Sequence, residues 1–342
     1  MRNSLYFIGL SVVLFSCTPQ KNIQKVSTKS KPVTSNVVLP PKTQPTSLPR
    51  HEIKKEGNYD FYRENIADAS KNDNTASYGS IVSANPAGYK IVKTYFPALA
   101  QNFRQKYIIL HYTALDDNKS VTVLTQQAVS AHYLVNNLGD RDIYQLVDEN
   151  KRSYHAGISA WRNDKMLNDT SIGIEIVNAG YTTDSSGFRT FPDFDDAQVK
   201  KVAALVKDIA DRYMIPPTNI LAHSDIAPTR KQDPGPKFPW KKLYDDYQIG
   251  MWYDETVKQG FYDQIIPEEF ALQTNTPQFI FKYQTALKTL GYGLEPSGSY
   301  DDATKKTIEA FQYHFRPQNY NGVMDAESWA ILQALNQKYP NK

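Results

Sequence analysis

The stretch LAHSDIAPTRKQDPGP (residues 221–236) holds a histidine, two aspartates, an arginine and a lysine among three prolines. It follows neither a helical nor a strand period, and a long irregular segment in a compact domain is usually functional or disordered. Imidazole and carboxylate groups bind divalent metals, and an ammonium group stabilises negative charge that develops during a reaction. His223, Lys231 and Asp233 are therefore the first candidates for a functional site.

A second histidine, His111, shares the context of His223, because each follows a short apolar run that predicts a buried strand. Adjacent strand ends of one sheet would bring the two imidazoles together. Asp233 would then complete the three protein ligands of an open zinc site, for which the folded part of the chain offers no cysteine. The alternative is a pair of hydrogen-bonded structural histidines, since the sequence has no HExxH helix. Spacing alone leaves both interpretations open.

Glu175 interrupts an otherwise apolar segment, SIGIEIVN (residues 171–178), whose alternation predicts a strand. It shares a face with Gly173 and Val177, and we expect these small residues to leave space in front of the carboxylate. Burial is costly for an unpaired carboxylate and raises its pKa, as a general base for a water molecule requires. A salt-bridged structural glutamate is the alternative.

Strands and helices alternate along the part of the chain that must position these residues. Residues 106–110 (KYIIL) and 219–223 (NILAH) predict short buried strands, and residues 195–213 carry the apolar stripe of an amphipathic helix. Asp195 and Gln198 are placed to form a capping box at the start of that helix. The alternation predicts an α/β domain.

A smaller second domain is expected over residues 254–342, which leaves 84–253 for the α/β domain. Two similar segments, GSYDDAT (298–304) and GVMDAES (322–328), each predict a turn glycine followed by an aspartate that caps a new helix. With the apolar stripe that precedes them, they predict a bundle of three short helices.

The N-terminal residues 1–17 have the pattern of an export signal: a basic start, an apolar run too short to span a bilayer, and Cys17. LFSC resembles a bacterial lipobox, which implies that Cys17 is lipidated and that the chain is held at a membrane. Residues 18–83 begin with a stretch rich in Lys, Ser, Thr and Pro and predict a flexible tether and lead-in. The formal net charge of +3 gives no overall case for a nucleic-acid partner.

Residues 106–240 resemble the zinc-dependent N-acetylmuramoyl-L-alanine amidases of the type-2 amidase family, which are related to the peptidoglycan recognition proteins. The matching pieces are IILHYTA, VSAHYLV, IYQLVDE, NDTSIGIEIVN and ILAHSDIAPTRKQDPGPKFPW. The resemblance implies a mixed central sheet flanked by helices. It also implies that His111, His223 and Asp233 bind one Zn²⁺ ion.

Further roles follow from the same resemblance. Glu175 would activate a water molecule and Lys231 would assist catalysis, while His155, in YHAG, and His132 would lie in the substrate groove. Residues 276–338 resemble the helical peptidoglycan-binding domain of wall hydrolases. Peptidoglycan and its muropeptide fragments are therefore the expected partners.

The leading hypothesis is a monomeric, lipid-anchored periplasmic amidase that cuts the bond between muramic acid and L-alanine. Thr18 follows the lipobox cysteine in place of the aspartate associated with inner-membrane retention, which favours the outer membrane. One alternative is a protein of the same fold that only binds peptidoglycan. Another is a zinc peptidase that cuts within the stem peptide.

Overall fold

The structure, a computed structural model, describes residues 86–88, 90, 102–187 and 189–340. The predicted signal peptide, lipidated Cys17 and tether lie outside the described residues, so they stay predictions. Among the described residues, no helix has the length and apolar character needed to cross a bilayer.

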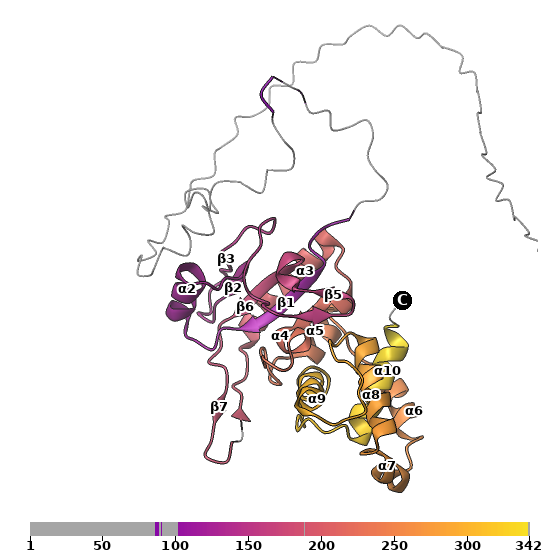
Figure 1. The fold of residues 1–342 in the computed structure, drawn as a ribbon. Helices are drawn as coiled ribbons and strands as arrows, with labels where there is room; N and C mark the ends of the chain where they lie inside the picture. Colours follow the sequence, from indigo (N-terminus) through magenta and orange to yellow (C-terminus); the bar gives the residue numbers. More distant parts are fainter. Residues whose placement is uncertain (1–85, 89, 91–101, 188, 341–342) are drawn as a thin grey trace, which may run out of the picture. The chain divides into compact units, whose positions relative to one another are not determined.

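The centre of the fold is a five-stranded sheet with the strand order β3-β2-β6-β1-β9 (Figure 1). Its middle strands pair in parallel and β3 pairs antiparallel with β2, so the predicted mixed sheet is confirmed. The isoleucines and leucines of β1, β6 and β9 are almost wholly buried, as in sheets covered on both faces. The strands are β1 (Tyr107–Tyr112), β2 (Tyr133–Val135), β3 (Tyr144–Gln145), β6 (Ser171–Ile176) and β9 (Ile220–Ala222).

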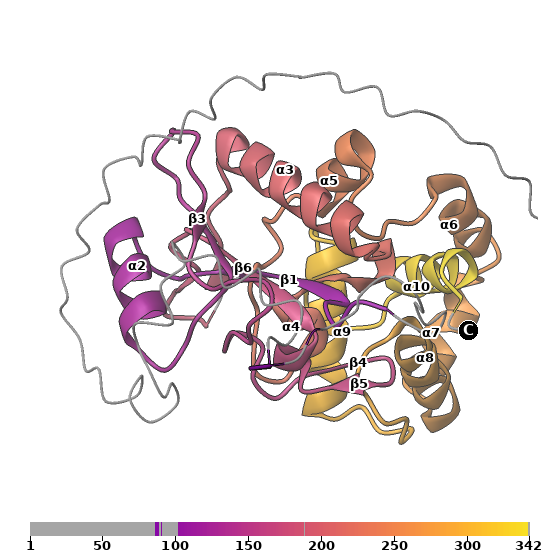
Figure 2. The same ribbon diagram turned by 90° about the horizontal axis from the view of Figure 1, so that it is seen from above.

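Helix α3 (Asp196–Tyr213) packs its predicted apolar stripe along the sheet (Figure 2). Asp195 caps it by accepting a hydrogen bond from the backbone N–H of Ala197, but the expected capping box is wrong. The amide of Gln198 instead donates to the backbone carbonyls at the ends of β2 and β6, so a tertiary contact replaces the local one. At the other side of the sheet, α2 (Asp117–Gln126) packs Leu124 into a small separate apolar cluster.

The segment 221–236 is less irregular than its sequence predicts. β9 ends at Ala222, and His223 begins a short helix, α4 (His223–Ile226). The Asp225 carboxylate accepts a hydrogen bond from the backbone N–H of Ala222 and so holds the first turn of this helix. The remainder of the segment is built from turns.

Two short hairpins lie outside the sheet, and each contacts the C-terminal region, through Trp161 with Tyr292 and through Arg189 with Glu309. The first consists of β4 (Ala160–Trp161) and β5 (Asp164–Lys165), and the second of β7 (Thr182–Thr183) and β8 (Arg189–Thr190).

The C-terminal region contains more helices than the three expected. Among the described residues beyond 253 there are five, and α5 (Trp240–Tyr247) precedes them. The predicted caps are confirmed, because Asp301 accepts from the N–H of Thr304 and Asp325 from that of Ser328. The five helices are α6 (Glu255–Tyr262), α7 (Pro267–Gln273), α8 (Pro277–Leu290), α9 (Asp302–Phe315) and α10 (Ala326–Lys338).

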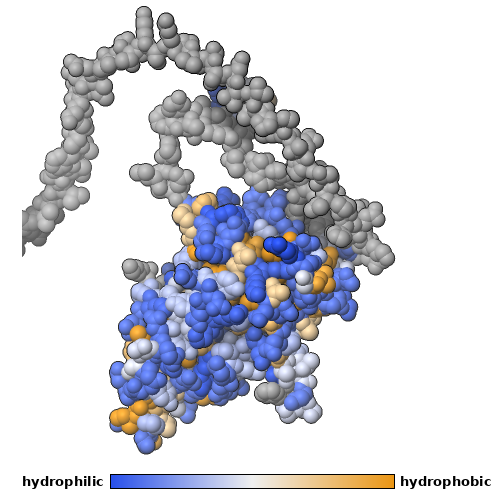
Figure 3. Space-filling model, turned by 180° about the vertical axis from the view of Figure 1, so that it is seen from behind, coloured by the Kyte–Doolittle hydropathy of each residue, from blue (hydrophilic) through white to orange (hydrophobic). Residues whose placement is uncertain are grey.

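Buried residues of the sheet and of the C-terminal helices belong to one hydrophobic cluster. Trp161 of the first hairpin packs edge-on against Tyr292, and its ring approaches Gly291 so closely that a Cβ there would lie 2.4 Å from it. On the face of the molecule shown in Figure 3, hydrophilic residues predominate and apolar residues form small, separate patches. Buried apolar residues of both regions thus form a shared core, and the expected boundary at residues 253–254 stays a prediction.

Candidate metal centre

Strand register brings the predicted site residues together at one edge of the sheet. In the pairing of β1 with β6, His111 lies directly opposite Glu175. In the pairing of β1 with β9, Leu110 lies opposite Ala222, so His111 and His223 are the next residue on each chain segment. The expected meeting of these two histidines is confirmed, although His223 belongs to the first turn of α4.

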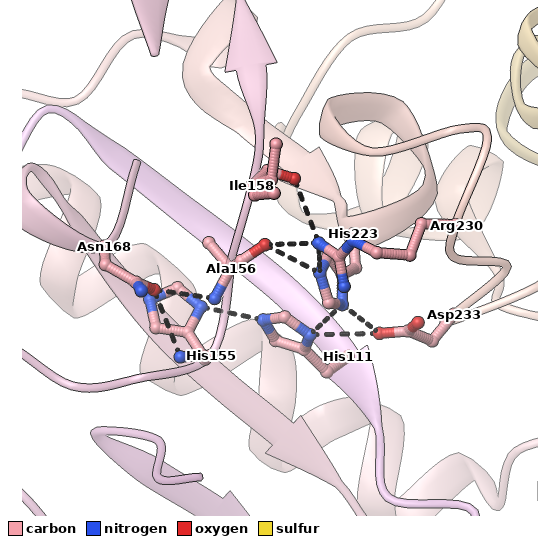
Figure 4. Close-up of polar contacts among 8 residues, drawn as sticks. All are labelled: His111, His155, Ala156, Ile158, Asn168, His223, Arg230 and Asp233. Atoms are coloured by element: carbon pink, nitrogen blue, oxygen red, sulfur yellow. Dashed lines mark hydrogen bonds and ion pairs between the residues drawn. The ribbon is translucent and has the colours of Figure 1, made fainter. Parts of the chain in front are cut away.

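His111, His223 and Asp233 converge on one point (Figure 4). The two Nδ1 atoms lie 2.8 Å apart, and Asp233 Oδ2 lies 3.0 Å from that of His111 and 2.9 Å from that of His223. The three residues are 1%, 2% and 6% exposed. A backbone hydrogen bond of 3.0 Å from Ser224 N–H to the Asp233 carbonyl fixes the two ligand-bearing segments to each other.

The outer nitrogen of His223 identifies its tautomer. Its Nε2 lies 3.1 Å from the carbonyl oxygen of Ala156, which can only accept a hydrogen bond. The Arg230 guanidinium, which can only donate, lies 3.4 Å from the same atom, so the shorter contact with Ala156 favours a proton on Nε2. In that tautomer, Nδ1 presents a lone pair toward Asp233, as in histidines that ligate metals.

A chain of hydrogen bonds gives the same result for His111. The Ser171 hydroxyl donates to the carbonyl of Leu167 at 2.5 Å, so its oxygen accepts from His155 Nε2 at 3.0 Å. His155 Nδ1 must then accept from His111 Nε2, 2.9 Å away. His111 Nδ1 is therefore also unprotonated, and two lone pairs and a carboxylate face one another without a proton between them. This donor set fits a bound cation and does not fit a purely hydrogen-bonded pair of histidines.

The electrostatics of the triad keep the His111 ring uncharged and the Asp233 carboxylate ionised. Burial, reinforced by the neighbouring His223, lowers the pKa of His111 to about 4, so its ring is neutral at pH 7. Burial alone would raise the pKa of Asp233, but His223 and His111 hold it well below its usual range. A neutral His111 beside an ionised Asp233 matches the protonation states that metal binding requires of these two groups.

Glu175 lies beside the triad, where its charged form is disfavoured. Its carboxylate is half-buried, and among the described residues no group hydrogen-bonds to its Oε2 atom. Burial and the charge of Asp233 raise the pKa of Glu175 to about 8, while Lys231 opposes the rise. A carboxyl group with this pKa can both accept and donate a proton near neutral pH.

The space in front of Gly173 is used differently from our expectation. A Cβ on Gly173 would lie 2.4 Å from the ring of His155, so the glycine accommodates that imidazole. The expectation that Gly173 leaves space in front of the Glu175 carboxylate is therefore wrong. The residue is needed because the hydrogen-bonded ring of His155 covers the strand at this point.

A cavity of about 350 Å³ opens onto the metal centre. The candidate proton carrier, Glu175, and the candidate charge stabiliser, Lys231, both line this cavity. The residues that matter for the chemistry are Tyr154, His155, Glu175, His223, Lys231 and Asp233.

The two histidines expected in the substrate groove, His155 and His132, occupy different places. His155 borders the cavity but is only 9% exposed, and its ring nitrogens already contact His111 and Ser171. His132 is fully buried and is absent from the described lining of the cavity. Its Nε2 donates to the carbonyl of Lys151 and its Nδ1 accepts from the N–H of Gly173. The structure thus brings His155 to the site as a neighbour of a ligand and does not bring His132 into the groove.

Arg230 is a site residue to which the sequence assigned no role. Its guanidinium donates to the carbonyls of Ala156 and Ile158, at 2.7 and 3.0 Å, and holds that loop against His223. Its position next to Lys231 could have marked Arg230 as a site residue. Its role could not be predicted, because the carbonyls that it contacts lie more than 70 residues away in the sequence.

Comparisons with known proteins agree with this geometry. Residues 101–236 match the family model described as N-acetylmuramoyl-L-alanine amidase, and residues 278–332 match that of a putative peptidoglycan binding domain. The chain is 43% identical to the N-acetylmuramoyl-L-alanine amidase AmiD of Escherichia coli (strain K12) over 241 residues, which cover 69% of this chain and 84% of that protein.

Solved structures extend the likeness to both regions of the chain. The complex of E. coli AmiD with the substrate anhydro-N-acetylmuramic acid-L-Ala-D-gamma-Glu-L-Lys has a TM-score of 0.67 and 42% identity, and covers 75% of this chain and 97% of that one. AmpDh3 from Pseudomonas aeruginosa has a TM-score of 0.65 and 41% identity, over 74% and 99%. With its convergent metal-ligand triad, this chain belongs to the N-acetylmuramoyl-L-alanine amidase family and is an amidase that acts on peptidoglycan fragments.

Proposed function

We propose that this amidase works with a single zinc ion held by His111, His223 and Asp233. The observation that carries the proposal is the convergence of two Nδ1 atoms and one carboxylate oxygen beside an open cavity. Two imidazoles and a carboxylate, with one position left open, form the ligand set of many catalytic zinc sites. When bound, zinc supplies Lewis acidity for the scissile carbonyl and lowers the pKa of a water molecule.

Glu175 is proposed as the group that moves the proton. Its carboxylate takes a proton from the attacking water, whose oxygen forms a bond to the carbonyl carbon. As the C–N bond breaks, Glu175 returns a proton to the nitrogen of L-alanine. The products are the free amine of the stem peptide and the carboxylic acid of the muramic lactyl group. A pKa of about 8 suits both transfers.

Lys231 is proposed to stabilise the negative oxygen of the tetrahedral intermediate. It lines the same cavity as Glu175 and Asp233, and it lowers the pKa of Glu175 through its charge. Loss of one such stabilising group typically reduces the rate by about 10²–10³. His155 is proposed to orient His111 through their 2.9 Å hydrogen bond, with any substrate contact limited to its small exposed edge.

The substrate is proposed to be a muropeptide, anhydro or not, cut between its muramic acid and L-alanine. AmiD was solved with an anhydro-muramyl tripeptide and AmpDh3 with an anhydromuramic pentapeptide, which supports this class. The C-terminal helices would hold the enzyme to the wall. We also propose that the enzyme is a monomer of the cell envelope, anchored through Cys17 to the periplasmic side of the outer membrane.

Product analysis tests this proposal. Digestion of purified muropeptides should release peptides that begin with L-alanine and leave the sugars intact, as mass spectrometry would record. A chelator should abolish the release, and zinc should restore it. Peptides shortened at an internal bond would instead identify a peptidase, and release that resists complete metal removal would contradict the role of zinc.

A further inference from the structure

A second cavity, of about 480 Å³, lies between the β7–β8 hairpin, α9 and the loop that follows α9. None of its described lining residues also lines the catalytic cavity. The lining residues on which the argument depends are Arg189, Lys305, Lys306, Gln318, Asn319 and Tyr320.

The aromatic wall of this cavity is held rigidly. The rings of Tyr313 and Tyr320 lie 5.3 Å apart, and Phe191 packs edge-on against both. Glu309 accepts a hydrogen bond of 2.8 Å from the Tyr313 hydroxyl and pairs with Arg189. Tyr313 and Phe191 are only 2% and 5% exposed, so they fix the half-buried ring of Tyr320, and little entropy is lost when a sugar or peptide packs on that ring.

The polar groups around this wall are free to bind a ligand. Within the part of the chain that the structure describes, the ammonium groups of Lys305 and Lys306 and the side-chain amides of Gln318 and Asn319 form no ion pair or hydrogen bond. Ammonium groups bind carboxylates, amides bind N-acetyl and peptide groups, and aromatic rings pack on sugar faces. A stem peptide on its amino sugar offers all three kinds of partner.

We propose that this cavity binds a second muropeptide unit of the wall, separate from the unit being cut. The proposal rests on the proposed function, since it assumes that the enzyme works on peptidoglycan. It places wall binding at a surface that combines the helical region with a hairpin of the catalytic region.

Binding of purified wall sacculi to Glu175→Gln protein, which cannot consume them, tests this site. The Lys305→Ala/Lys306→Ala variant should bind about tenfold more weakly, because each lost charge-assisted hydrogen bond weakens binding. Lys241→Ala/Lys242→Ala, an equal charge change on α5, should bind as the parent does. Equal binding by all three proteins would overturn the proposal.

The same lysine substitutions in the active enzyme separate this proposal from the proposed function. Cleavage of a soluble single-unit muropeptide should be unchanged, while cleavage of sacculi should fall. A parent enzyme inactive on both substrates would instead contradict the proposed function itself.

A different observation concerns Asp225, a fully buried carboxylate two residues after the ligand His223. It accepts hydrogen bonds from Ala222 N–H at 2.8 Å, from the Tyr292 hydroxyl at 2.7 Å and from His314 Nδ1 at 2.7 Å. Two of these three donors belong to the C-terminal region. A carboxylate buried this deeply is tolerated only because all three are present.

These hydrogen bonds fix the backbone that carries the metal ligands His223 and Asp233. Ala222 and Asp225 flank His223, so the carboxylate fixes the backbone on both sides of it. Ser224, between His223 and Asp225, holds the Asp233 carbonyl through its N–H. His314 is itself held by stacking on Trp240, with ring centroids 3.9 Å apart.

We infer that Tyr292 and His314 are positioning residues for the metal centre, and that the helical region is part of its scaffold. Removal of a group that orients a metal ligand typically weakens metal binding about 10- to 100-fold. The inference rests on the proposed metal site. Zinc affinity and the absorption spectrum of bound cobalt are the two measurements that probe it.

Tyr292→Phe tests the inference beside Tyr300→Phe, which removes a hydroxyl hydrogen bond of the same 2.7 Å length, to the Gly322 carbonyl, without contact to Asp225. Tyr292→Phe should bind zinc at least about tenfold more weakly and alter the cobalt absorption spectrum, while Tyr300→Phe should do neither. His314→Phe should behave like Tyr292→Phe, and His314→Asn, which keeps a donor near the Nδ1 position, should recover part of the affinity. Equal zinc affinity of Tyr292→Phe and Tyr300→Phe would overturn the inference.

Discussion

Two buried groups of histidine and aspartate lie close together in this protein, and they differ in what the nitrogen atoms offer. At the metal centre, His111 and His223 turn their Nδ1 atoms toward Asp233, and their outer nitrogens already have hydrogen-bond partners. At the junction with the helices, Asp225 receives three donors and leaves nothing for a cation. Burial and proximity are the same in both groups, so the direction of the hydrogen bonds is what identifies a metal site.

The aspartates of the two groups should respond oppositely to the same change, and this is the largest expected effect. Asp233→Asn should abolish zinc binding and activity but leave the metal-free protein folded, because an amide of the same shape can still hydrogen-bond to the two imidazoles. Asp225→Asn should lower the free energy of unfolding by about 3–5 kcal/mol, because it breaks a buried network. Calorimetry of the metal-free proteins measures the stability of each variant, and metal analysis measures its zinc content. Equal destabilisation by the two variants would break the comparison.

Glu175→Gln should keep zinc and lose turnover. Loss of a general base typically reduces the rate by about 10²–10⁴, and the amide retains the shape of the carboxylate without accepting the proton. kcat/KM on a soluble muropeptide, with zinc content measured on the same sample, gives the answer. Activity near that of the parent would refute the assignment of Glu175.

Lys231→Met should reduce kcat by about 10²–10³ and change KM little, if its charge acts mainly on the intermediate. Lys237→Met is a matched control, since Lys237 pairs with Asp193 and does not line the catalytic cavity. A rise in KM with unchanged kcat would instead make Lys231 a residue that binds the ground state.

The smallest effect concerns the stability of the metal-free protein. Glu175 has a pKa of about 8 in the folded state against an ordinary value near 4.5, so the folded state binds more protons between these pH values. The contribution of Glu175 to stability therefore falls as pH rises from about 4.5 to 8. Glu175→Gln should be more stable than the parent by about 1–2 kcal/mol at pH 8, less than the full shift implies, because the side chain is partly exposed. No difference between pH 5 and pH 8 would contradict the raised pKa.

The sequence marks the candidate ligands locally, by strands that end in histidine and by a dense polar motif, but spacing alone leaves the metal open. The mixed sheet and the full ligand set are implied by the family resemblance. The roles of Gln198 and Asp225 could not be predicted, since their partners lie on other elements. Asp225 and Asp233 stand in the same motif, and only the fold shows that one faces the cavity and the other faces the helices. Gly173 was misread for the same reason: His155, 18 positions earlier in the sequence, fills its space.

The most direct test of the account is the position of zinc itself. A crystal of the zinc-loaded enzyme, with anomalous scattering measured at the zinc edge, should show one ion at about 2.0–2.2 Å from His111 Nδ1, His223 Nδ1 and a carboxylate oxygen of Asp233, and none at Asp225. An ion bound elsewhere, or ligation through the Nε2 atoms, would contradict the proposed metal centre.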